Sequence, residues 1–201
     1  MNLVCFDLDG VLVDSADWHY ESFNAAMVEV VGAPLSREEH ETTFNGLNTL
    51  KKIELLIRQG RLPAGATDRL VKSKAQSFSN IIKTKLKPCP QKIALVEEVK
   101  RQFLHVAVVS NCNRLNTNLL LEGLDLLDRV HYTASSSDVI AGKPSPEGYY
   151  KAMLAIGSNP SNTLIVEDSA IGVAAAKASG AAYVVVRNPS EVTMELLSPY
   201  L

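Results

Sequence analysis

The sequence lacks any marked excess of one charge. Its 20 lysines and arginines nearly balance its 22 aspartates and glutamates, giving a formal net charge of -2. Nucleic acids and anionic membranes attract basic surfaces, so we expect neither as a partner.

Long apolar runs are also absent, and none approaches the roughly 18 residues that a membrane-spanning helix needs. Asp7 interrupts the first apolar run before a signal-peptide core could form, so the expected location is the cytoplasm.

Cysteine is scarce as well. Cys5, Cys89 and Cys112 form no CxxC or Cys/His spacing, so the sequence predicts neither a disulfide framework nor a zinc site. We expect reduced thiols, with packing or chance as the explanation for Cys112. What is present, 46% hydrophobic and 21% charged residues over 201 positions, is typical of a soluble globular protein. This length predicts one domain with an insertion or two small domains.

Short apolar runs recur along the chain, separated by helical patterns. The expected strands are 2–6, 105–110, 129–134, 163–167 and 181–186. Continuous apolar strands that alternate with helices indicate a parallel sheet covered on both faces. The predicted fold class is therefore α/β, with a Rossmann-like parallel sheet.

A helical segment is inserted between the first two expected strands. Residues 7 to 104 separate those strands, far more than one crossover helix requires. Four helical patterns fill most of this stretch: 15–32, 36–44, 50–60 and 67–82. We predict a core domain of residues 1–14 and 84–201 and a helical bundle of residues 15–83.

Polar residues and one glycine follow the expected strands, and a lysine lies in the segment "AGKPSPEGYY", just before a helix. They are Asp7, Asp9, Gly10, Ser110, Asn111, Lys143, Glu167 and Asp168. In an open parallel sheet, ligands bind outside the carboxyl ends of the strands. These residues are therefore expected to meet at one edge.

Four carboxylates gathered at that edge would repel one another. A hard divalent cation with oxygen ligands is the economical remedy, and Mg²⁺ fits because it keeps places for waters and a phosphate. The Lys143 ammonium, the Ser110 hydroxyl, the Asn111 amide and the amides of the Asp9–Gly10 turn would add donors for an anionic substrate.

Each of these residues also has a plainer interpretation. "DLDG" is ordinary turn chemistry, and most lysines, Lys143 included, lie on surfaces. Glu167 and Asp168 could cap and charge the first turn of the helix expected at 169–180. Their ordered occurrence after successive strands favours a shared site.

Four segments in order carry a family resemblance. "DLDGVLVD", "VVSN", "GKPSPE" and "VEDSAIG" resemble the motifs of the haloacid dehalogenase superfamily of phosphotransferases, and the helical insertion resembles the cap of its sugar-phosphate phosphatase and β-phosphoglucomutase branch. The resemblance implies a Mg²⁺-dependent phosphatase acting on a small phosphorylated metabolite, with the protein a monomer or weak dimer. A phosphosugar mutase and a non-catalytic phosphate-binding module remain alternatives.

The resemblance also assigns roles. Asp7 would be the nucleophile that forms an aspartyl-phosphate, and Asp9 the general acid and base. The Asp7 carboxylate, the Asp9 main-chain carbonyl and Asp168 would hold the cation, with Glu167 in or next to its shell. Ser110 and Lys143 would bind the phosphoryl oxygens.

The inserted segment departs from the mutase pattern. Its loop "FNGLNTLKK" offers Asn48 and Thr49 where the mutase-like loop carries an arginine that binds phosphate. An arginine clamp is not interchangeable with a lysine, which favours the phosphatase. Roles for His19 and Lys74 in this segment stay open.

Overall fold

The computed structural model describes residues 1–44, 47–102 and 105–200. The chain divides into two compact units. The core unit comprises Met1–Ser15 and Leu86–Leu201, and the inserted unit comprises Ala16–Lys85. That the inserted unit acts as a cap stays a prediction, as does the monomeric or weakly dimeric state.

A five-stranded sheet organises the core unit. Its strands are β1 (Leu3–Phe6), β2 (His105–Val109), β3 (Tyr132–Ala134), β4 (Thr163–Glu167) and β5 (Ala182–Val185). They lie in the order β3-β2-β1-β4-β5, and every pairing is parallel. The predicted α/β fold with a parallel sheet is confirmed. β1 lies at the centre, and all four of its side chains are buried.

The third strand is shorter than expected. A 3₁₀ turn, Leu127–Arg129, occupies the start of the predicted segment 129–134. Arg129 is held in that turn because its Nε donates to the carbonyl of Asp125 at 2.6 Å. The strand can therefore begin only after this turn.

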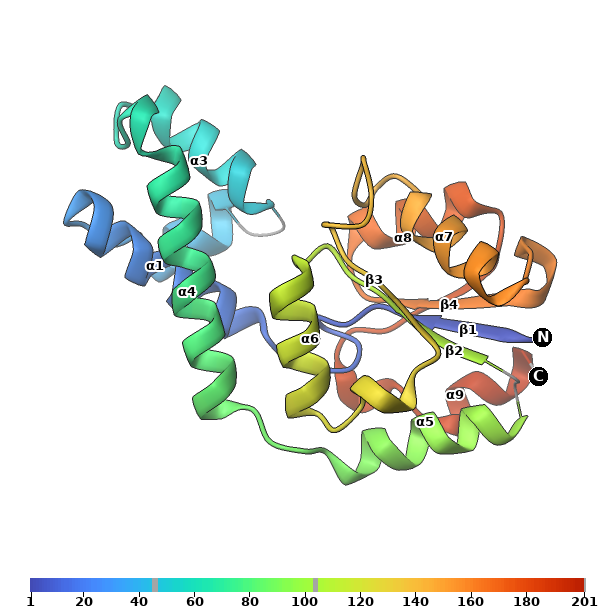
Figure 1. Cartoon of the computed structure of the whole chain (residues 1–201). Coiled ribbons are helices and arrows are strands. Elements are labelled where there is room, and N and C mark those ends of the chain that lie inside the picture. The colour runs from blue at the N-terminus through green and yellow to red at the C-terminus, as the bar shows by residue number, and fades with distance from the viewer. Residues whose placement is uncertain (45–46, 103–104, 201) are drawn as a thin grey trace. The chain divides into compact units, whose positions relative to one another are not determined.

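Helices cover both faces of the sheet. They are α5 (Pro90–Gln102), α6 (Arg114–Gly123), α7 (Glu147–Ile156), α8 (Ala170–Ser179) and α9 (Met194–Leu197). Figure 1 shows α7 and α8 on one face and α5 and α9 on the other. Ala175 and Ala176 of α8 are completely buried in the main apolar cluster, so the small side chains of this helix pack closely on the sheet.

The inserted unit is helical, as the sequence predicts. It contains α1 (Ala16–Val31), α2 (Arg37–Glu39) followed by a π-helical turn (His40–Phe44), α3 (Thr49–Arg58) and α4 (Thr67–Lys85). Its own apolar core includes Phe23, Met27, Phe44, Leu56 and Leu70. A separate core of this kind is what lets the segment fold as a unit.

Short 3₁₀ turns complete the description: Ala64–Ala66, Leu127–Arg129, Pro160–Asn162, Pro189–Glu191 and Ser198–Tyr200. Across the three described ranges, no helix combines the length and the apolar character needed to cross a membrane.

Candidate active site

The loop after β1 turns sharply at Gly10. Gly10 has φ +81°, and its N–H donates to the carbonyl of Val13 at 2.7 Å. A Cβ at this position would lie 1.9 Å from Oδ2 of Asp168. Only glycine combines this backbone conformation with such a close approach, so Gly10 brings the β1 loop against the carboxylate that follows β4.

Asp9 lies in the same loop, and two side chains hold its carboxylate. Ser15 Oγ donates to Oδ1, and the thiol of Cys112 donates to Oδ2 at 3.2 Å. Cys112 was expected to be present through packing or chance, and the structure places its thiol in contact with a candidate site residue. The chain brings this thiol to Asp9 because β1 and β2 are neighbours in the sheet.

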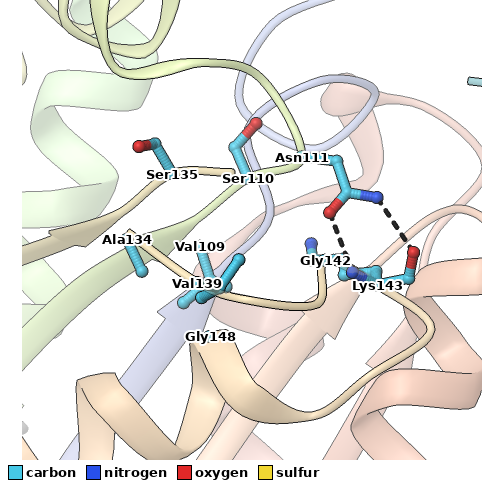
Figure 2. A pocket seen from close by; sticks show the side chains of 9 residues that line it. All are labelled: Val109, Ser110, Asn111, Ala134, Ser135, Val139, Gly142, Lys143 and Gly148. Carbon is cyan, nitrogen blue, oxygen red and sulfur yellow. Dashed lines mark hydrogen bonds between the residues drawn. The ribbon is translucent and has the colours of Figure 1, made fainter. Parts of the chain in front are cut away.

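The residues after β2 brace the site. Ser110 is buried, and its Oγ accepts the N–H of Cys112 at 2.9 Å. The Asn111 amide makes two bonds with the backbone of Lys143: Oδ1 accepts from N at 2.9 Å, and Nδ2 donates to O at 3.2 Å (Figure 2). Asn111 thus positions the Lys143 loop, and its predicted contact with substrate stays a prediction. A Cβ on Gly142 would lie only 2.7 Å from Oδ1 of Asn111.

Lys143 is the charge centre of the site. Its side chain is 5% exposed, which contradicts the interpretation as a surface lysine. Nζ donates to Oδ1 of Asp7 at 2.7 Å and to Oε1 of Glu167 at 2.5 Å. The charge of the ammonium is thus shared by two buried carboxylates.

Asp7, Glu167 and Asp168 form a carboxylate cluster, in which one oxygen of each lies within 4.8 Å of the others. Burial is the main reason that the pKa of Asp7 lies well above its usual value. The nearby Lys143 ammonium acts in the opposite direction. Burial, followed by the charge of Glu167, raises the pKa of Asp168 to about 6.

This cluster fits a divalent cation. Its donors are all carboxylate oxygens, the ligands that hard cations prefer, and its negative charge exceeds what Lys143 neutralises. The Asp9 side chain is instead held by Ser15 and Cys112. That Asp9 would offer a cation its main-chain carbonyl stays a prediction.

Glu167 and Asp168 do not cap α8. Ser169 is the N-cap, and its Oγ accepts the N–H of Gly172 at 3.1 Å. Gly172 itself matters, because a Cβ there would lie 2.0 Å from Oε2 of Glu167. The start of α8 can therefore lie directly against the buried Glu167 carboxylate.

Sequence reasoning missed Tyr149. This residue comes from α7 and is completely buried, and its hydroxyl donates to Oε1 of Glu167. Burial, with the neighbouring charge of Glu167, raises the pKa of Tyr149 well above its usual value, so the hydroxyl stays protonated. The only sequence signal was its place on the apolar face of a helix, which predicts burial but no partner.

The family model described as "Haloacid dehalogenase-like hydrolase" matches residues 4–186. The chain belongs to this family. The resemblance carried by the four sequence segments is confirmed.

Relatives of this haloacid dehalogenase-like hydrolase include proteins named as enzymes that act on sugar phosphates. The chain is 25% identical to "Beta-phosphoglucomutase" of Bacillus subtilis (strain 168), and the match covers 98% of this chain and 94% of that protein. It is 26% identical to "Phosphorylated carbohydrates phosphatase" of Thermotoga maritima, covering 90% and 82%. The crystal structure of CbbY from Rhodobacter sphaeroides in complex with phosphate shares its fold, with a TM-score of 0.81 and 22% identity over 92% of this chain and 85% of that one.

The remaining candidate site residues of this haloacid dehalogenase-like hydrolase, His19, Lys74 and the loop "FNGLNTLKK", belong to the inserted unit. His19 stacks on Phe78 with ring centroids 4.2 Å apart, and its Nδ1 lies 3.2 Å from Nζ of Lys74. Both contacts lie within the inserted unit. In the loop "FNGLNTLKK", residues 45 and 46 lie outside the described residues, and Asn48 caps α3 by accepting the N–H of Lys51 at 2.9 Å.

Proposed function

We propose that the protein is a Mg²⁺-dependent phosphatase that hydrolyses a small phosphomonoester of the sugar-phosphate class through an aspartyl-phosphate. One observation carries the proposal: Lys143 bridges Asp7 and Glu167 beside Asp168, at the carboxyl ends of the central strands. A buried lysine held against a carboxylate cluster suits the transfer of an anionic phosphoryl group.

Asp7 is the nucleophile in this proposal. Lys143 donates to its Oδ1 and so favours the ionised carboxylate that the reaction needs. An Asp7 oxygen forms a bond to phosphorus while the ester oxygen leaves with its electron pair. Hydrolysis of the resulting aspartyl-phosphate then regenerates Asp7 and releases inorganic phosphate.

Asp9 moves the proton in both halves. In its protonated form it donates to the leaving oxygen, and as a carboxylate it then takes a proton from the attacking water. Ser15 and Cys112 donate to its two oxygens and so fix its orientation. Proton transfer is sensitive to small displacements, so a carboxylate held from both sides suits this role.

Ser110 and Lys143 bind the phosphoryl oxygens. Ser110 Oγ already accepts the N–H of Cys112, which leaves its own proton to donate to the substrate. Asp7, Asp168 and the Asp9 carbonyl would hold Mg²⁺, with Glu167 in or next to the shell. The cation would neutralise charge on the cluster and on the phosphoryl group.

A mutase is the second candidate, favoured by the similarity to β-phosphoglucomutase across 98% of this chain. In a mutase a sugar hydroxyl, rather than water, accepts the phosphoryl group. The loop "FNGLNTLKK" supplies no arginine to grip a second phosphate, which favours the phosphatase.

The test is phosphate release from a panel of sugar phosphates, nucleotides and short acid phosphates, with Mg²⁺ or with chelator. Asp7→Asn and Asp9→Asn should abolish Mg²⁺-dependent release, whereas Asp128→Asn, on the exposed surface of the core unit, should not. Near-normal release by Asp7→Asn would remove it as the nucleophile.

The same assay separates the alternatives. Conversion of a sugar 1-phosphate to its 6-phosphate in the presence of a bisphosphate primer, without phosphate release, would indicate the mutase. Failure of both reactions would favour a non-catalytic phosphate-binding module.

A further inference from the structure

Tyr149 lies within the charge cluster but belongs to none of the family motifs. Its hydroxyl donates to Oε1 of Glu167, and both residues are completely buried. A buried donor and a buried carboxylate depend on each other, because neither can exchange its partner for bulk water. The hydroxyl therefore restrains the carboxylate of Glu167.

The same carboxylate oxygen also binds the lysine. Nζ of Lys143 donates to Oε1 of Glu167 at 2.5 Å and lies 5.2 Å from the centroid of the Tyr149 ring. The ring of Tyr149 thus contacts the Lys143 ammonium, and its hydroxyl binds Glu167, the carboxylate that holds this ammonium. Two contacts from one rigid side chain restrict where Nζ can lie.

Close packing holds Tyr149 in place. A Cβ on Gly148 would lie 2.7 Å from Cγ1 of Val109, so α7 approaches β2 more closely than a larger residue would permit. Tyr150, the next residue on α7, is instead 45% exposed, and its hydroxyl donates to the carbonyl of Ala178 at 3.0 Å. The two adjacent tyrosines form a matched pair for experiment.

We propose that Tyr149 is a positioning residue for phosphoryl transfer: its hydroxyl fixes Glu167, and Glu167 and the tyrosine ring together fix the Lys143 ammonium beside Asp7. The inference rests on the proposed function, because it assigns Tyr149 to the reaction of Asp7. Tyr149 acts through Glu167 and Lys143 rather than on the reacting atoms.

The first test compares Tyr149→Phe with Tyr150→Phe. Each variant removes one hydroxyl and keeps the ring. We expect kcat to fall about tenfold in Tyr149→Phe, as befits loss of a hydrogen bond to a charged group, with KM nearly unchanged. Tyr150→Phe should match the wild type in both constants.

The second test reads the lysine directly, without substrate or metal. In protein carrying ¹⁵N-lysine, the ¹H–¹⁵N signal of the Lys143 ammonium is identified by its absence from Lys143→Met. We expect this signal to shift or broaden in Tyr149→Phe and to stay unchanged in Tyr150→Phe. A tyrosine that only fills space would leave it in place.

The outcomes separate the two proposals. With an active wild-type enzyme, unchanged kcat in Tyr149→Phe overturns the positioning role, even if the Lys143 signal shifts. With an inactive wild-type protein, the proposed function fails, and an unchanged signal would overturn the positioning of Lys143 as well. Should Tyr149→Phe not fold, Tyr149→Gln is compared with Tyr149→Leu. Gln retains a donor, and equal turnover in the two variants would refute the proposal.

Discussion

Gly10→Ala tests how the β1 loop meets Asp168. The added Cβ imposes two costs, because Gly10 has φ +81° and the Cβ would lie 1.9 Å from Oδ2 of Asp168. The left-handed backbone costs about 1–2 kcal/mol for a residue with a side chain. Displacing the Asp168 side chain from its rotamer adds about 1 kcal/mol. The free energy of unfolding should therefore fall by about 2–3 kcal/mol.

Gly157→Ala isolates the first of these costs. Gly157 also has a positive φ, +74°, but a Cβ there meets nothing within 4 Å. In urea denaturation, the free energy of unfolding of Gly157→Ala should be lower than that of the wild type by about 1–2 kcal/mol. Its affinity for the cation should equal that of the wild type. Gly10→Ala should in addition bind Mg²⁺ at least about tenfold more weakly in calorimetry, because Asp168 is displaced. Wild-type Mg²⁺ affinity in Gly10→Ala would refute the proposed place of Asp168 in the cation site.

Three further substitutions probe charge and bracing. Lys143→Met leaves the buried carboxylates of Asp7 and Glu167 without their ammonium, so urea denaturation should show a loss of about 3–5 kcal/mol, and phosphate release should cease. Asn111→Ala removes both bonds to the Lys143 backbone, so amide hydrogen exchange at Lys143 should accelerate; unchanged exchange would contradict the bracing role. Burial, followed by the charge of Lys74, lowers the pKa of Lys52 to about 8. The folded state then binds fewer protons than the unfolded state between pH 8 and the usual lysine pKa of about 10.5, so this lysine makes stability rise with pH across that window. Lys52→Met should be more stable by about 1–2 kcal/mol at pH 7, a gain that disappears by about pH 10.5 in urea denaturation; a constant difference would refute the shifted pKa.

The sheet was predictable from the sequence because buried parallel strands consist of consecutive apolar residues. Two features of the chain did not follow from that pattern. The start of β3 was misplaced because Arg129 bonds back into a turn. Pro90 opens α5, where its missing N–H costs nothing, although a proline by itself usually marks a turn or a helix end.

Part of the site was also predictable, because the order of the parallel strands decides which loops lie together. Residues that follow parallel strands meet at one edge, and the structure brings Asp7, Lys143, Glu167 and Asp168 together. The contacts of Tyr149 and Cys112 were not predictable, because a helical face or a loop position does not specify which side chain lies opposite. Such pairings depend on distances across the sheet that no sequence period encodes.

The central place of β1 has a consequence during synthesis. Asp7 is made before its partner Lys143, which follows 136 positions later. At about 5–20 residues per second, translation separates the two by on the order of ten seconds. Both neighbours of β1, β2 and β4, also emerge later than the inserted unit. The nascent chain therefore carries the apolar strand β1, followed by an aspartate without its lysine, before the strands that pair with β1 have been made.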